Sequence, residues 1–281
     1  MNIQLISDLH LESHPHFSVG PAPGADLLVL AGDIGSYQEE SMLSELGVAD
    51  FGLARFSPMP RAQGGADWPV PVFYIPGNHE YDGLDFDATH ARLREACERL
   101  GITWLERESI VHGGIRFIGC TLWTDFDGLT AQQARQGSIT AAEQLKEREK
   151  AFRAANFYLR TYHTLRGGEP MLAQAMREES LKSQDWLRAA LAVPFEGTTV
   201  VITHFAPSLL SADPRYGLVP GTAGFCNALD DLLPLADIWM HGHLHCAIDY
   251  VSQGCRVVAN PLGYAGKGEQ EAFRPDFCVT V

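Results

Sequence analysis

The sequence has no CxxC cysteine pair and no long apolar segment. Of its six cysteines, several stand inside short apolar runs, as Cys120 and Cys278 do. Such cysteines are typical of buried free thiols in a reducing compartment. No apolar run reaches the length that crosses a bilayer, and the polar-flanked opening segment does not resemble a secretory leader. We therefore expect a cytoplasmic protein that makes no membrane contact.

Basic residues are also scarce. The 21 Lys and Arg residues stand against 35 Asp and Glu residues, which gives a formal net charge of -14. An acidic surface repels a polyphosphate backbone, so we expect no binding to long nucleic acid, and a nuclease acting on long DNA is disfavoured. Bound cations would offset part of this charge, and the acidic residues that hold them would gather in one cleft.

Short apolar runs rich in Val, Ile and Leu recur along the chain. Their near-continuous apolarity predicts strands that are covered on both faces. A helical pattern over 88–100 ends at Gly101, and the 57–71 stretch, rich in Gly and Pro, predicts a surface loop. The predicted strands are 3–6, 27–30, 70–75, 116–122, 198–202, 237–240, 256–259 and 277–281.

The stretch from about 131 to 191 has a helical character. Thr140 and Glu143 fit a capping box, and apolar residues follow at helical spacing until Gly167. A second helix is expected from near Pro170. Because strands on both sides of this stretch carry parts of one site, we interpret it as a helical insertion in a single α/β domain that spans 1–281.

Polar side chains stand where five of the predicted strands end. The carboxyl ends of parallel strands meet at one crevice, so these side chains are expected to lie together. Each motif alone is weak, because a lone His at a strand end is more often a core or surface residue than a ligand. Their combination in one order predicts a metal site. The five clusters are Asp8–Leu9–His10, Gly32–Asp33, Gly77–Asn78–His79–Glu80, Thr203–His204 and Gly242–His243–Leu244–His245.

The donor atoms in these clusters are all nitrogen or oxygen. Alternate residues of an extended segment point the same way, so Asp8 and His10 can share one ion, and His243 and His245 can both reach the crevice. Seven ligands are too many for one tetrahedral centre but suit two ions with room left for water. A carboxylate between the ions is the natural bridge. The seven candidate ligands are Asp8, His10, Asp33, Asn78, His204, His243 and His245.

The order Asp-x-His, Gly-Asp, Gly-Asn-His-Glu, Thr-His, Gly-His-x-His resembles the calcineurin-like metallophosphoesterase superfamily. The resemblance implies a four-layer α-β-β-α sandwich of two mixed β-sheets flanked by helices. It also implies that Asp33 bridges the metals and that His79 points at the substrate phosphate. The implied ligands are Asp8, His10, Asp33 and His245 for the first metal, with Asn78, His204 and His243 completing the second.

Two differences from the superfamily's motifs argue against two of its branches. Protein Ser/Thr phosphatases of this superfamily carry Gly-Asp-x-x-Asp-Arg, but here Ser36 and Tyr37 replace the second Asp and the Arg. A phosphoprotein phosphatase is therefore not expected, and the partner of His79 is left unidentified. Purple acid phosphatases have Gly-Asp-x-x-Tyr and Asp-x-Gly. Here Tyr37 comes one residue too late and His10 replaces the Gly, so a tyrosinate-bound ferric site is not expected.

The expected reaction is attack on phosphorus by a metal-bridging hydroxide, with two ions of Mn, Fe or Zn. His79 would donate a hydrogen bond to the phosphoryl group or protonate the leaving oxygen. No phosphate-clamping Arg stands in the motifs, which favours a small phosphodiester over a monoester. The alternatives are a phosphomonoesterase or nucleotide phosphatase of the same fold, or a catalytically inactive metal-binding interaction module. The sequence does not predict the oligomeric state.

Residues around the clusters carry weaker hypotheses. His241 is a candidate outer partner of a ligand imidazole, and the 207–220 and 260–264 segments could contact substrate from the rim. Within the insertion, 184–191 is expected to pack in the core, whereas polar and aromatic residues at 156–164 suit a substrate pocket. The alternative is that the whole insertion only covers a sheet face. No metal role is expected for His14, His16, His90, His112 and His163.

Overall fold

The computed structural model describes residues 1–162 and 164–281, so the hypothesis about His163 lies outside the described residues. The strands are Asn2–Ile6 (β1), Leu27–Ala31 (β2), Val72–Ile75 (β3), Thr103–Trp104 (β4), Glu108–His112 (β5), Ile115–Cys120 (β6), Leu165–Arg166 (β7), Glu169–Pro170 (β8), Thr199–Thr203 (β9), Ile238–His241 (β10), Ile248–Ser252 (β11), Cys255–Ala259 (β12) and Cys278–Thr280 (β13).

The α-helices are Met42–Glu45 (α1), Phe86–Leu100 (α2), Gly128–Arg135 (α3), Ala141–Tyr162 (α4) and Ala173–Ala192 (α5). Short 3-10 helices run over Leu53–Phe56, Arg61–Gln63, His79–Tyr81, Leu209–Ser211, Pro220–Gly224, Asp230–Leu235, Ala265–Lys267 and Glu269–Ala272.

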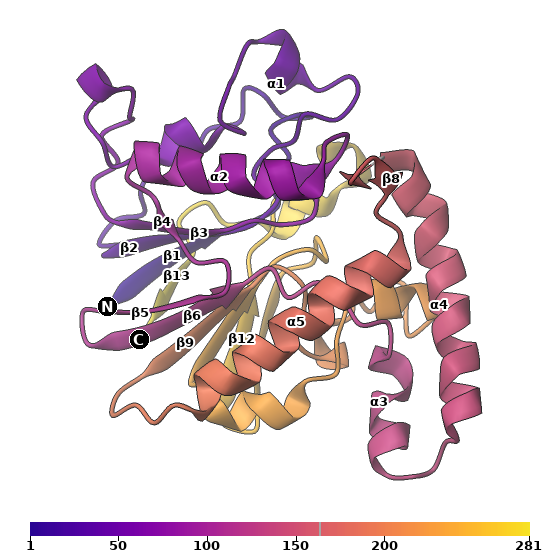
Figure 1. Ribbon diagram of the computed structural model, residues 1–281. Coiled ribbons are helices and arrows are strands. Elements are labelled where there is room, and N and C mark those ends of the chain that lie inside the picture. Colours follow the sequence, from indigo (N-terminus) through magenta and orange to yellow (C-terminus); the bar gives the residue numbers. More distant parts are fainter. Residues whose placement is uncertain (163) are drawn as a thin grey trace.

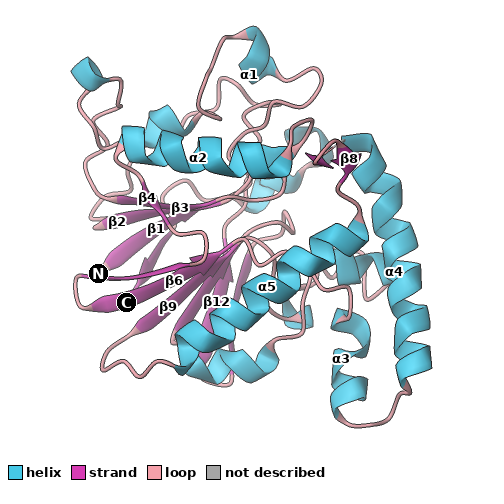
Figure 2. Cartoon of the chain, viewed as in Figure 1, coloured by secondary structure: helices cyan, strands magenta, loops and turns pink. Residues whose placement is uncertain are grey.

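Two mixed β-sheets pack face to face (Figures 1 and 2). The first sheet has the order β13-β1-β2-β3-β4, and the second has the order β11-β12-β10-β9-β6-β5. Their facing sides share one buried core, in which Leu5 and Val29 of the first sheet meet Phe117 and Met240 of the second. The central strands β1, β2, β3, β6, β9 and β10 pair in parallel, and their near-continuous apolar sequences fit burial on both faces.

Helices cover the outer faces of both sheets. Helix α2 lies over the first sheet and α5 over the second (Figure 1). Helix α2 begins where the Asp85 carboxylate accepts a hydrogen bond from the Ala88 N–H, and it ends at Gly101, whose left-handed φ of 67° suits glycine. The predicted α-β-β-α sandwich is therefore confirmed.

The insertion is helical, as predicted. The capping box starts α4: the Glu143 N–H donates to Thr140 Oγ1 at 3.2 Å, and the Thr140 N–H donates to Glu143 Oε2 at 2.9 Å. After α4 the chain forms the small β7–β8 hairpin and then enters α5. Leu187 and Leu191 of α5 are buried, and Trp186 packs partly against them, which confirms the core interpretation of 184–191.

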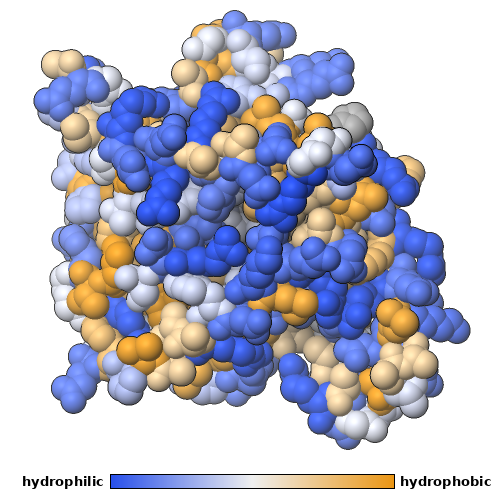
Figure 3. All heavy atoms as spheres, viewed as in Figure 1, coloured by the Kyte–Doolittle hydropathy of each residue, from blue (hydrophilic) through white to orange (hydrophobic). Residues whose placement is uncertain are grey.

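The described part of the chain contains no helix that is long and apolar enough to span a membrane. Hydrophilic side chains cover most of the face viewed in Figure 3, and the apolar residues there gather in small separate groups. This distribution agrees with the acidic composition.

Candidate metal centre

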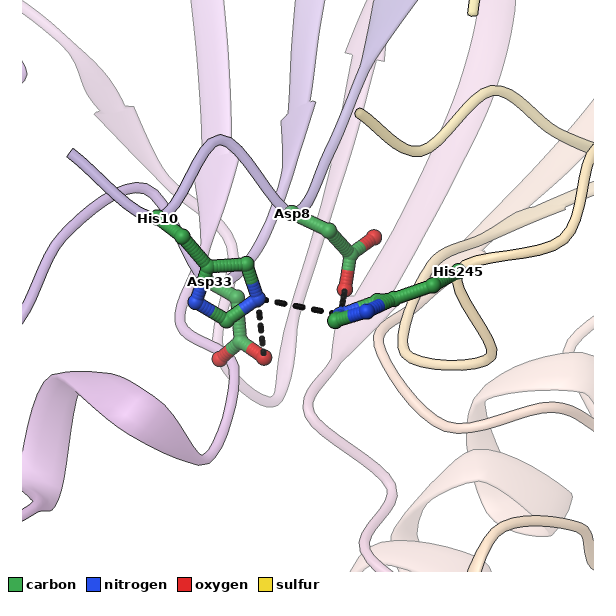
Figure 4. A group of neighbouring side chains, drawn as sticks. All are labelled: Asp8, His10, Asp33 and His245. Atoms are coloured by element: carbon green, nitrogen blue, oxygen red, sulfur yellow. Dashed lines mark hydrogen bonds and ion pairs between the residues drawn. The ribbon is translucent and has the colours of Figure 1, made fainter. Parts of the chain in front are cut away.

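The seven predicted ligands come together at the carboxyl ends of the parallel strands. Donor atoms of Asp8, His10, Asp33 and His245 lie within 4.8 Å of one another, and so do those of Asp33, His204 and His243. Figure 4 shows the first group: Asp8 and His10 share the loop after β1, and Asp33 and His245 converge on them from two other loops. The seventh residue, Asn78, places its Oδ1 3.2 Å from His204 Nε2. Asp33 belongs to both groups.

The local backbone differs from the extended geometry assumed from the sequence. Ligand side chains converge through left-handed turns that non-glycine residues rarely adopt. Neighbouring glycines make room for these turns: a Cβ atom at Gly77 would lie 2.1 Å from Asp33 Oδ1, and one at Gly242 would lie 2.6 Å from Asp8 Oδ2. The left-handed φ angles are 54° at Asp8, 46° at His10, 54° at Asp33, 72° at His243 and 47° at His245.

Buried polar atoms at the centre lack ordinary partners. Asp8 Oδ2 and His243 Nε2 have no hydrogen-bond partner among the described residues. His10 Nε2 lies 3.0 Å from His245 Nε2, so two ring nitrogens face each other. A buried carboxylate oxygen without a partner is costly, and a cation removes that cost. The nitrogen and oxygen donors therefore fit divalent metal ions such as Mn, Fe or Zn.

Outer partners orient several of the ligand imidazoles. His10 Nδ1 lies 2.8 Å from Glu12 Oε1, His245 Nδ1 lies 2.6 Å from Glu269 Oε2, and His204 Nδ1 donates to the Ala31 carbonyl at 2.8 Å. Each contact turns Nε2 toward the centre and favours the tautomer that leaves Nε2 free to bind. Although burial opposes it, the hydrogen bonds from His245 and the Tyr264 N–H hold the pKa of Glu269 at about 2.

The sequence did not reveal these outer partners. Glu12 stands two residues after His10, a spacing that could have indicated it, whereas nothing in the sequence links Glu269 to His245. His241, the predicted outer partner, is buried, and its described hydrogen bonds are to Ser211 Oγ and the Gly242 carbonyl. The predicted contact of His241 with a ligand imidazole is therefore not found among the described residues.

His79 lies beside the centre and has an acidic partner. Its Nδ1 lies 2.5 Å from Asp82 Oδ2, and its backbone N–H donates to Asp33 Oδ1 at 2.8 Å. Burial alone would lower the pKa of His79, but Asp82 and Asp33 raise that pKa well above its usual range. Side chains three residues apart eclipse in a 3-10 helix. The family's supporting Asp is replaced here by Ser36, which left the partner of His79 unidentified. The spacing His79-x-x-Asp82 could therefore have indicated Asp82 as that partner.

The family model of the calcineurin-like phosphoesterases matches residues 1–247, most of the chain. The chain belongs to this family. It is thus a phosphoesterase, as the sequence predicted, from a family of enzymes that hydrolyse small phosphate esters and typically bind divalent metals.

One solved structure and one further protein sequence are also similar to this chain. The phosphopantetheinyl hydrolase of Mycobacterium tuberculosis superposes with a TM-score of 0.58 and 19% identity, over 96% of this chain and 92% of that one. At this identity the likeness shows the shared fold. An uncharacterized protein, L509, of Acanthamoeba polyphaga mimivirus is 24% identical over 223 residues, which are 73% of this phosphoesterase and 71% of L509.

Glu80 holds the loops of the phosphoesterase site in place. Its buried carboxylate accepts hydrogen bonds from the backbone N–H groups of Asp33, Ile34 and Gly77, at 2.8 to 3.1 Å. Burial and the nearby Asp33 raise the pKa of Glu80 to about 8. The last residue of the Gly-Asn-His-Glu motif therefore ties the loop after β2 to the loop after β3.

The insertion touches the site through the β7–β8 hairpin. Thr164 Oγ1 donates to Asp82 Oδ1 at 3.3 Å, and the Leu165 N–H donates to the Leu84 carbonyl at 2.9 Å. Arg166 then pairs with Asp87 of α2 and Glu179 of α5. The hairpin is therefore docked on the segment that follows His79.

The residues at 156–164, which were predicted to line a pocket, differ in what they contact. Asn156 Oδ1 accepts a hydrogen bond from the Ala173 N–H, which is a structural contact between α4 and α5. Tyr158 is 60% exposed. Of this stretch, Thr164 has a described contact with the site, and it was not singled out from the sequence.

Aromatic rings pack on ligands of both groups. Tyr264 packs on His10 with 4.3 Å between ring centroids, and its ring lies 5.1 Å from that of His245. Phe205 packs on His243 at 4.0 Å. Of the two predicted rim segments, 260–264 contacts the ligands, whereas Arg215 in 207–220 pairs with Asp213.

Proposed function

We propose that this phosphoesterase hydrolyses small phosphodiesters with two bound metal ions, of Mn, Fe or Zn. The observation that carries the proposal is the sharing of Asp33 by two groups of donor atoms. Bound ions would lower the pKa of a water nucleophile and neutralise charge on the phosphoryl oxygens. The first ion would be held by Asp8, His10, Asp33 and His245, and the second by Asp33, Asn78, His204 and His243.

His79 is proposed as the general acid. Asp82 engages Nδ1 and thereby fixes the orientation of the ring, and Nε2 would face a phosphoryl or leaving-group oxygen. The hydrogen bond from the His79 N–H to Asp33 keeps the imidazole next to the shared ligand. Its ring centroid lies 4.9 Å from that of His10. A proton donated from this position would leave with the departing alcohol.

The preference for diesters is supported by the charges around the ligands. Among the described residues, no Arg or Lys makes a hydrogen bond or ion pair with any of the seven proposed ligands. A phosphomonoester carries more negative charge than a diester and gains more from such a cation. A phosphomonoesterase or nucleotide phosphatase on the same ligands is the competing function. An inactive interaction module is disfavoured because His79 and the full donor set are retained.

The test compares bis(p-nitrophenyl) phosphate with p-nitrophenyl phosphate, using protein stripped by a chelator and reloaded with Mn²⁺. Elemental analysis gives the metal content of each sample. We expect two ions per chain, no turnover without them and a higher kcat/KM for the diester. A higher kcat/KM for the monoester would replace the diester proposal with the competing function. Full metal content without turnover of any ester would favour the interaction module.

A further inference from the structure

A groove of about 420 Å³ lies between the loop that follows β1 and the loop that follows β12. Its volume falls in the range of small-molecule pockets, and its walls are mainly apolar. The walls include His14, Pro15, Phe17, Leu262, Ala265 and Gln270.

The walls of the groove belong to segments that also contact the metal centre. One wall belongs to the segment that begins at His10, and the other contains Leu262 and Ala265 on either side of Tyr264. The Tyr264 ring packs on His10 at 4.3 Å, and it lies 6.5 Å from the ring of His14 in the groove wall. His14 is itself fixed to this loop, because its Nε2 donates to the Gly263 carbonyl at 3.2 Å. Tyr264 therefore contacts a proposed ligand and lies near the groove wall, so a molecule that extends from the centre into the groove would have to pass this ring.

Two polar groups mark the groove and its edge. Gln270 lines the groove, and its side-chain oxygen is buried without a hydrogen-bond partner among the described residues. Such an acceptor is costly unless a donor satisfies it. At the edge, the exposed Lys267 places Nζ 4.8 Å from the centre of the Tyr264 ring, where its charge can attract an anionic ester.

We propose that this groove is the subsite for the organic group of the ester substrate. The group that fits is one with an apolar face, to pack on Phe17 and Leu262, and an N–H or O–H donor that the Gln270 side chain can turn to meet, because its oxygen is covered in the empty groove. This inference rests on the proposed function, because it assumes that the phosphoryl group lies at the metal centre.

The experiment uses methylphosphonate and phenylphosphonate, which bind without being hydrolysed, and measures their Kd by calorimetry on the metal-loaded protein. Burial of a phenyl ring predicts that phenylphosphonate binds about tenfold more tightly than methylphosphonate. The exposed Ala265 is replaced by Trp to fill the groove. Ala265→Trp should remove the preference for phenylphosphonate and leave the affinity for methylphosphonate unchanged, which also shows that the variant is folded. The matched control is Ala189→Trp, at an exposed position of α5, which should keep the preference.

The role of Gln270 is tested with 2-, 3- and 4-aminophenylphosphonate, because each ring amine supplies an N–H donor at a different place. At least one isomer should bind the wild type more tightly than phenylphosphonate does, and Gln270→Leu should remove that gain. Tight binding of methylphosphonate with an equal affinity for phenylphosphonate would overturn the groove proposal alone. Failure of both phosphonates to bind, with no turnover of any ester, would refute the proposed function.

Discussion

Asp33 is the residue at which the two groups of ligand side chains meet. One of its oxygens accepts the His79 N–H, and the other lies 3.1 Å from His204 Nε2. Replacing Asp33 with Asn keeps the size and removes the charge, so both ions should be weakened at once. We expect Asp33→Asn to lower metal content and kcat more than Asn78→Ala, which removes a ligand of one proposed ion. Elemental analysis and steady-state kinetics on both variants check this, and equal losses would argue against a shared ligand.

His79 and Asp82 should act as a pair. His79→Ala should lower kcat by roughly 10²–10⁴ on an ester with a poor leaving group while metal content is unchanged, since this is the usual contribution of a positioned acid. Asp82→Asn should give a smaller loss of the same kind, because the ring stays but loses its charged acceptor. A p-nitrophenyl ester needs little protonation and serves as the internal control for both variants. Loss of metal from His79→Ala would show that His79 is a ligand instead.

At the scale of the elements, apolar content predicted the buried strands better than the half-exposed strands. Each of the eight predicted runs overlaps a strand, because the central strands are buried on both faces and need continuous apolar residues. The edge strands β5 and β11 were missed, since they alternate between half-buried and exposed positions and carry polar residues such as Glu108 and Asp249. The strand β4 has two residues, which is too short for any pattern.

The candidate site was predictable where its residues follow strands. All seven proposed ligands stand in loops that begin at the carboxyl end of a strand, so topology alone groups them. Thr164 and Glu269 were not predictable, because they reach the site through tertiary packing of segments whose own sequences carry no motif. Whether these ligands bind metal, whether the chain is one domain and whether the protein is cytoplasmic stay predictions.

The β7–β8 hairpin should influence catalysis through Thr164. Thr164→Val keeps the shape of the side chain and removes the hydroxyl that donates to Asp82. We expect kcat on a poor leaving group to fall roughly fivefold, as for about 1 kcal/mol lost with one hydrogen bond. Thr161→Val is the matched control, because the exposed Thr161 hydroxyl bonds a carbonyl of its own helix. An equal effect of both variants, or an equal effect on a p-nitrophenyl ester, would remove Thr164 from the mechanism.

Across the whole molecule, the acidic composition has a local explanation. Asp8, Asp33, Glu12 and Asp82 are all buried around one centre. Carboxylates gathered in this way repel one another unless cations lie among them. Part of the net charge of -14 therefore reflects the site and not the surface.

Metal removal should accordingly destabilise the fold. Ions that bind the folded chain at 100 times their Kd add about 2.7 kcal/mol to the free energy of unfolding. We expect a chelator to lower the Tm and Mn²⁺ to restore it. In Asp33→Asn the chelator should lower the Tm by less than in the wild type, because this variant binds the metal ions more weakly from the start. Calorimetric scans of the wild type and of Asp33→Asn, each with chelator and with Mn²⁺, measure these changes in Tm. A wild-type Tm that the chelator leaves unchanged would contradict the expectation.

The first and last strands of the described chain pair, and a segment late in the sequence supports the loop that carries Asp8. Strand β1 pairs with β13, in register from Asn2 with Thr280, and the Gly263 N–H donates to the carbonyl of Asp8 at 3.0 Å. The Asp8 and His10 N–H groups donate to the carbonyls of Gly32 and Asp33, so the support from Gly263, about 250 positions after Asp8, is the last of these bonds to become available during synthesis. On the ribosome, Asp8, His10 and Asp33 are made long before His204, His243 and His245. We therefore expect the complete ligand set, and with it full metal loading, only after β10 and the loop that follows it have been made.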